Sequence, residues 1–142
     1  VPQTGMAVTI DIGEAKDIHP PNKQDVGARL ARIARAEVYG EAIESSGPLY
    51  AGMDADGDAI RIRFAHAKGL KTADGGPVRG FTVAGADGRF VPAQAVIDGE
   101  AVRVKSPAVS APRAVRYAWA DVPKANLVNG AELPASPFRT DS

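Results

Sequence analysis

A carboxylate and an imidazole lie two residues apart in this sequence, at Asp17 and His19. They follow an apolar stretch and precede a segment with helical periodicity, and loops in that position carry the ligand crevices of α/β sheets. A histidine there can act as a general base when a nucleophile approaches one ring nitrogen and an acceptor holds the other N–H. Taken alone, an Asp-x-His-Pro loop also fits a purely structural role, so the neighbouring elements have to be considered.

A predicted strand and a predicted helix flank this loop. Residues Met6–Ile12 (MAVTIDI) are apolar and rich in β-branched side chains, which predicts a strand in the interior of a mostly parallel sheet. From Asn22 to Tyr39 apolar residues recur every three or four positions, which predicts an amphipathic helix. Asn22 is a suitable N-cap, and Gly40 a suitable C-terminal stop. The apolar positions are Val26, Leu30, Ile33 or Ala34, and Val38; Arg29, Arg32 and Arg35 are expected on the solvated face.

The remainder of the chain favours a small antiparallel sandwich. Apolar and polar residues alternate, and four Asp-Gly dipeptides suit turns with positive φ angles. We expect strands at 48–53, 59–66, 80–84, 91–97, 101–106 and 114–120, with turns at Asp56-Gly57, Asp74-Gly75, Asp87-Gly88 and Asp98-Gly99. The segment from Val122 to Ser142 has no periodicity, and we expect it to be an irregular tail.

Several other residues are best explained structurally. Tyr117 and Trp119 are expected on one face of the last strand, as core residues rather than a surface that stacks on sugars. The other residues are given structural roles: His66 a hydrogen-bonded or surface position, Ser45 and Ser46 a turn, and the acidic run Asp54–Asp58 an exposed turn that lacks the later ligands of a calcium loop.

Composition excludes several classes of function. Lys+Arg and Asp+Glu are both 17, so the chain has no basic field for nucleic acid or for an anionic membrane. The chain has no cysteine, which excludes thiolate chemistry and cysteine-ligated metals. No apolar run is long enough to span a bilayer. One strand and one helix cannot bury a core by themselves, so either the sandwich covers residues 1–44 or these residues are the last β–α piece of a larger α/β domain, which is the interpretation we prefer.

Several separated segments carry a family resemblance. The stretches TGMAVTIDIGEAKDIHPPNKQDVGARLA, ESSGPLY, GFTVAGADGRFVPAQAVIDG, VRYAWAD and LPASPFRTD resemble the C-terminal part of the sialate O-acetylesterase family, a branch of the SGNH hydrolases. The resemblance covers nearly the whole chain. It implies an α/β/α hydrolase domain ahead of this segment and a β-rich domain after it.

The resemblance also implies site residues. The His-Pro pair before the last helix of the family carries the catalytic histidine, which corresponds to His19. The family commonly places the acid three residues before the histidine, where this chain has Lys16, so Asp17 is the first choice for the acid and Asp11 the alternative. The nucleophilic serine, and the glycine and asparagine of the oxyanion hole, belong to N-terminal blocks that this chain does not contain. No metal or organic cofactor is implied.

These inferences define an expected organisation and function. Residues 1–44 are expected to carry the histidine of a hydrolase domain, residues 45–121 to form an antiparallel β domain, and residues 122–142 to pack back on the hydrolase domain. The expected function is the C-terminal fragment or subunit of an esterase that deacetylates sialic acids or polysaccharides, incomplete without an N-terminal partner that bears the serine. The resemblance places such enzymes in the periplasm or outside the cell. The alternative is a non-catalytic β-sandwich module that binds carbohydrate or a protein.

Overall fold

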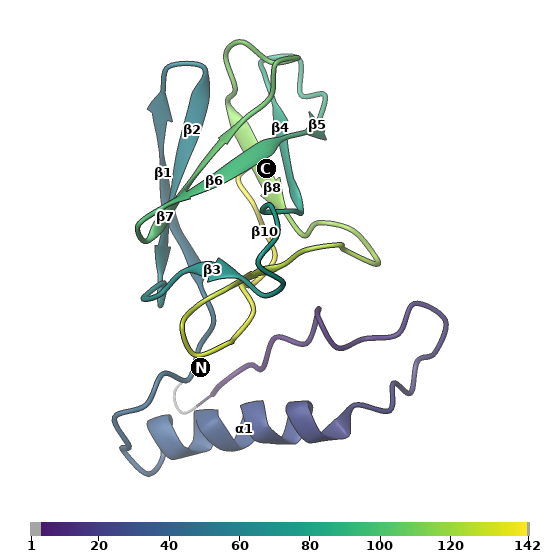
Figure 1. Ribbon diagram of the computed structural model, residues 1–142, viewed down its shortest axis with the longest axis vertical. Helices are drawn as coiled ribbons and strands as arrows, with labels where there is room; N and C mark the ends of the chain where they lie inside the picture. Colours follow the sequence, from purple (N-terminus) through teal and green to yellow (C-terminus); the bar gives the residue numbers. More distant parts are fainter. Residues whose placement is uncertain (1–3, 142) are drawn as a thin grey trace.

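Two antiparallel sheets form the larger part of the protein, whose computed structural model describes residues 4–141 (Figure 1). One four-stranded sheet has the order β1 (Leu49–Asp56), β2 (Ala59–Ala65), β7 (Ala101–Lys105), β6 (Gln94–Asp98). The other has the order β10 (Phe138–Arg139), β8 (Ala114–Tyr117), β4 (Phe81–Ala84), β5 (Val91–Pro92). A third, small sheet pairs β3 (Lys71–Thr72) with β9 (Leu127–Val128). The expected antiparallel β domain is therefore confirmed.

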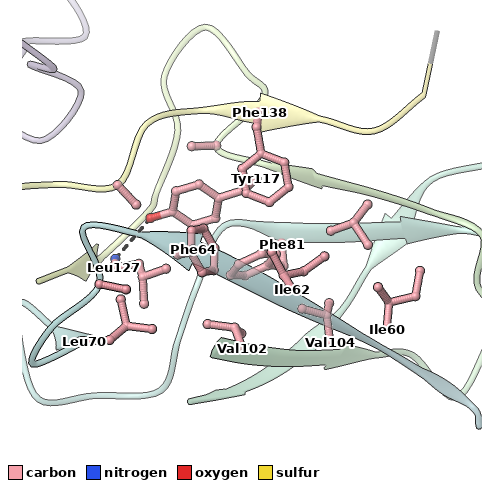
Figure 2. Packing of buried hydrophobic residues seen from close by; sticks show 14 of the residues in the cluster. Ile60, Ile62, Phe64, Leu70, Phe81, Val102, Val104, Tyr117, Leu127 and Phe138 are labelled. Atoms are coloured by element: carbon pink, nitrogen blue, oxygen red, sulfur yellow. Dashed lines mark hydrogen bonds between the residues drawn. The ribbon is translucent and has the colours of Figure 1, made fainter. Parts of the chain in front are cut away.

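The core lies between the two larger sheets, where the central strands β2, β7, β4 and β8 turn buried side chains inward. On β2 and β7 the buried members include Ile60, Ile62 and Val104, whereas the intervening arginines face outward. Aromatic rings fill the other side, where Tyr117 and Phe138 stack with ring centroids 6.0 Å apart (Figure 2). The sandwich therefore has a hydrophobic core of its own.

The turn chemistry read from the sequence is confirmed at all four Asp-Gly dipeptides. Gly57, Gly75, Gly88 and Gly99 have φ angles of 60°, 70°, 69° and 62°. Two of these turns join strands that are paired directly, β1 with β2 and β6 with β7. Glycine adopts this left-handed conformation without steric cost, so the turns fix the register of both hairpins.

Helix α1 (Lys23–Glu37) is the only helix in residues 4–141, and its ends agree with the prediction. The Asn22 side chain accepts a hydrogen bond from the backbone N–H of Asp25 at 3.2 Å. Gly40 has a φ of +70°, and the backbone N–H of Glu41 donates back to the carbonyl of Arg35. The helix lies outside the sandwich, with the chain that precedes it running between the two (Figure 1). It is too short and too polar to cross a membrane.

The strand expected at residues 6–12 is not formed. Within the part of the chain that the structure describes, these residues pair with no strand, and Met6 is 78% exposed. An extended segment without neighbours gains no ladder of hydrogen bonds, so an apolar sequence alone does not make it a strand. Of the expected α/β hydrolase layer, residues 4–141 thus contain the helix and its preceding segment, but not the sheet.

The tail differs from the irregular segment that was expected. It contributes β9 and β10, and its residues Leu127, Ala135 and Phe138 belong to the core of the sandwich. A strand of two residues is too short to show a recognisable alternation in the sequence. The positions of β9 and β10 are determined by the strands they pair with, β3 and β8, which are distant in the chain. The same segment also contacts the connector between α1 and β1, where the backbone N–H of Ser136 donates to the carbonyl of Pro48 at 3.0 Å.

Asn129 holds this connector in place. Its buried amide donates to the carbonyls of Ser46 and His66 at 2.8 and 2.9 Å, and its oxygen accepts from two tail N–H groups. Gly47 lies so close to the tail that a Cβ there would be 1.9 Å from the carbonyl oxygen of Pro134. The end of the helical unit is therefore attached firmly to the sandwich by the last residues of the chain.

Candidate active site

The loop between residues 13 and 22 is turned by its own backbone and is exposed to solvent. The N–H of Asp17 donates to the carbonyl of Glu14 at 3.4 Å, and an Asp17 carboxylate oxygen accepts from the backbone N–H of His19 at 2.8 Å. Ile18, between them, is 91% exposed. A carboxylate that binds an N–H two residues on is the usual Asx-turn, which stabilises the loop without help from other elements.

The structure brings the two predicted site residues together through the backbone rather than through the imidazole. His19 is exposed, and among residues 4–141 its ring has no hydrogen-bond partner. A catalytic histidine needs an acceptor that fixes one ring nitrogen, and Asp17 uses its carboxylate on the main chain instead. In this structure the loop therefore exposes the imidazole of His19 to solvent.

Asp11, the alternative acid, is already engaged. Both of its carboxylate oxygens accept from the guanidinium of Arg29, at 2.6 and 2.7 Å, and the same Arg29 donates to the carbonyl of Val8 at 2.7 Å. These hydrogen bonds to Asp11 raise the pKa of Arg29 above its ordinary value. Two parallel N–H···O bonds of this kind are strong and directional. In this arrangement Asp11 connects the segment before the loop to the helix after it.

The arginines of α1 are not simply a solvated face, which corrects the expectation from sequence. Arg29 is 12% exposed in its pair with Asp11, and Arg32 donates to the carbonyl of Glu44. Arg35 pairs with Glu41 near the helix end and remains half exposed. Periodicity alone cannot distinguish these cases, because an arginine stem can lie along a packed surface while its head group finds acceptors there.

The apolar positions of the helix are only partly covered. Ile33 packs so closely against Gly5 that a Cβ on the glycine would be 2.1 Å from the nearest side-chain carbon. By contrast Leu30 and Val38 are 51% and 67% exposed, and no helix residue is buried. A helix with an apolar stripe normally buries that stripe against another element. Part of the surface of α1 thus lacks the cover that its sequence predicts.

Most of the residues given structural roles have no contact that suggests chemistry, but not all take the predicted local structure: Asp54–Asp56 belong to strand β1 rather than a turn, and Ser45 and Ser46 form no turn. His66 Nδ1 lies 2.8 Å from the carboxylate of Glu44, and the Ser46 hydroxyl donates to the carbonyl of Gly47. The acidic run is occupied by cationic side chains, since Asp54 pairs with Arg63 and Asp56 with Arg103. In residues 4–141 no three histidine, aspartate or glutamate side chains are grouped as a metal site.

Trp119 also differs from its prediction, which placed it in the core beside Tyr117. Tyr117 is 1% exposed, but Trp119 is 52% exposed and lines a hollow of about 600 Å³ together with residues of the loop segment, Thr9 to Ala15. The two residues separate because Ala118 has a φ of +51°, which ends the alternation of β8. The sequence does not indicate that an alanine will adopt a positive φ angle, so the exposure of Trp119 could not have been predicted.

A β-sandwich joined to a loop and helix in this manner also occurs in the crystal structure of a carbohydrate acetylesterase. This enzyme is XAC1771 from Xanthomonas citri, whose crystal structure matches 96% of this chain with a TM-score of 0.92 and 51% sequence identity. This chain spans 32% of the length of that enzyme. No family model and no curated protein matches the sequence.

Proposed function

We propose that this chain is the histidine-bearing C-terminal portion of a carbohydrate O-acetylesterase of the SGNH type. The observation that carries the proposal is the similarity to the Xanthomonas citri enzyme, at 51% identity over nearly the whole chain. Because the chain spans about a third of that enzyme, the rest of the catalytic apparatus belongs to the other two thirds. The substrate class is an acetylated carbohydrate, either a polysaccharide or a sialic acid, and the site of action is the periplasm or the extracellular space.

The partly uncovered surface of α1 supports the need for a partner. Leu30 and Val38 on the helix, and Met6 on the preceding segment, are all more than half exposed. We propose that a hydrolase portion bearing the serine nucleophile covers these residues. Its docking would give residues 6–12 strands to pair with, and the apolar stretch would then become an interior strand as its sequence predicts.

In this proposal the reaction is a two-step acyl transfer. The serine of the hydrolase portion attacks the acetyl carbonyl while His19 takes its proton, and His19 then returns that proton to the departing sugar oxygen. A water activated by the same imidazole releases acetate from the acetyl-enzyme. Asp17 is the acid, and its carboxylate would turn from the backbone N–H of His19 to the ring when the loop is covered. Backbone N–H groups of the hydrolase portion would bind the oxyanion.

A chimera tests the proposal directly. The matching third of the Xanthomonas citri enzyme is replaced by this chain, and acetate release from acetylated xylo-oligosaccharides and from O-acetylated sialic acid is measured. We expect activity in the chimera and a loss of about 10³-fold or more with His19→Ala, the order expected when a catalytic base is removed. His66→Ala is the matched control, because it removes the other histidine of the chain and should retain activity.

Two results would contradict the proposal. One is a folded chimera that releases no acetate, or whose activity does not depend on His19. The other is hydrolysis of p-nitrophenyl acetate by the isolated 142-residue chain in a manner that His19→Ala abolishes, because the chain would then hold a complete site by itself.

A further inference from the structure

Trp119 is turned out of the sandwich by the residue before it. In a regular strand, residues two apart share a face, so Trp119 would point into the core with Tyr117. Instead β8 ends at Tyr117, and Ala118 adopts a φ of +51° while its N–H donates to the carbonyl of Gly80 at 2.9 Å. Alanine rarely adopts this conformation, and such residues concentrate at functional sites. The fold therefore holds an indole at the surface against the local tendency of the strand.

The exposed indole lies on the wall of a hollow. The hollow has a volume of about 600 Å³, within the range of small-molecule sites, and both apolar and acidic residues line it. Residues 118–123 form one wall and residues of the segment 9–15 form another, so the hollow lies between the sandwich and the start of the candidate catalytic loop. His19 is four residues beyond Ala15, the last loop residue in the lining.

The lining chemistry suits a sugar ring. An indole offers a flat apolar face with an N–H at its edge, which complements the C–H face and the hydroxyls of a pyranose. Glu14 and Asp121 add carboxylates that accept hydrogen bonds from hydroxyl groups. The guanidinium of Arg139 lies 5.5 Å from the centre of the indole ring, a cation–π contact that helps to fix its orientation.

We propose that this hollow binds a pyranose ring of the carbohydrate, with the indole of Trp119 as its stacking surface. The inference rests on the proposed function for the class of ligand. It goes further in assigning a subsite to the β domain, beside the loop that carries His19. Trp119 then contributes to the positioning of the sugar and to specificity, while the acetyl group reacts at the loop.

The binding test uses the chain itself, because Trp119 is its only tryptophan. The probes are acetylated xylo-oligosaccharides, the same oligosaccharides after alkaline deacetylation, and O-acetylated sialic acid. We expect at least one probe to produce a saturable change in tryptophan emission. Calorimetry should show Trp119→Ala binding that probe about three- to tenfold more weakly, in line with the worth of one aromatic contact. Tyr39→Ala is the control, because Tyr39 is an exposed aromatic outside the hollow and its removal should leave affinity unchanged.

The outcomes separate this inference from the proposed function. If no probe changes the emission, or if Trp119→Ala binds as well as the unaltered chain, the subsite is wrong even where the chimera releases acetate. If binding depends on Trp119 while the chimera is inactive, the subsite is supported and the esterase proposal fails. If the chimera is active and Trp119→Ala raises its KM with little change in kcat, both are supported.

Discussion

The carboxylate of Asp11 and the guanidinium of Arg29 face each other in two hydrogen bonds of 2.6 and 2.7 Å, across 18 residues of sequence. With the third bond from Arg29 to the carbonyl of Val8, this pair joins the two arms on either side of the candidate catalytic loop. Among residues 4–141, the segment before the loop is therefore joined to α1 by the hydrogen bonds of Arg29 rather than by strand pairing.

Replacing Arg29 with methionine should release the preceding segment from the helix. Methionine keeps much of the apolar stem but none of the N–H donors, so we expect a local loss of about 1–2 kcal/mol from the charge-assisted bonds. Hydrogen exchange should show faster exchange in the amides of α1, with the sandwich unaffected. Arg35→Met is the matched control, since its exposed pair with Glu41 is screened by solvent and should contribute much less. Equal effects of the two substitutions would mean that the Asp11 contact does not hold the loop.

Tyr117 should make the sandwich sensitive to alkali. Burial raises the pKa of this phenol to about 12, and its oxygen accepts the backbone N–H of Leu127 at 3.1 Å (Figure 2). Because the folded protein holds the proton more tightly than the unfolded chain does, the stabilisation is complete below about pH 10 and declines as the pH rises toward 12. Urea midpoints across this range should fall.

The substitution Tyr117→Phe isolates this effect. At neutral pH it leaves the buried N–H of Leu127 without its acceptor, which should cost about 1–3 kcal/mol. Above pH 10 the difference from the unaltered protein should shrink, because phenylalanine has no proton to lose. Tyr39→Phe, at an exposed position, should change neither quantity. A difference that stays constant from pH 8 to 12 would contradict the interpretation.

Asp74 should contribute to stability at neutral pH and lose that contribution in acid. The Arg79 side chain first, and then the Asn126 side chain and the backbone N–H of Gly76, lower the pKa of Asp74 to about 2 from an ordinary 3.8. A lowered pKa in the folded state gives stabilisation that is present above pH 4 and disappears as the pH falls toward 2. We expect Asp74→Asn to be less stable at pH 7 and to converge with the unaltered protein near pH 2. Parallel curves of urea midpoint against pH would show that Asp74 is not the responsible group.

Local signals in the sequence were sufficient for much of the fold. Asn22 and Gly40 mark the two ends of α1, and they could be predicted because capping depends on the residues at the helix ends. The Asp-Gly turns could be predicted because they depend only on the local preference of glycine for positive φ angles. Alternation found the strands at 59–65 and 101–105 almost to the residue. Residues 6–12 do not form the predicted strand, because a strand requires neighbouring strands to pair with. Strands β9 and β10 could not be predicted, because two residues are too few to show an alternation of apolar and polar side chains.

The site was only partly predictable for the same reason. The sequence places Asp17 and His19 in a loop directly before a helix, and the structure agrees with that position. The hydrogen-bond partners of these side chains are a property of three-dimensional contacts, so neither the use of Asp17 by the main chain nor the pairing of Asp11 with Arg29 follows from spacing. Trp119 illustrates the limit most clearly, since its exposure depends on the backbone of Ala118.

The bonds from Asn129 to Ser46 and His66 have a consequence for biosynthesis. Residues 46 and 129 are separated by most of the sandwich, so the connector to the helical arm cannot reach its final position until residue 129 has left the ribosome. Emergence of the segment that carries Asn129 would then be the event that fixes the connector, and until that point the helix and its preceding loop would be attached to the growing sandwich only through the chain itself.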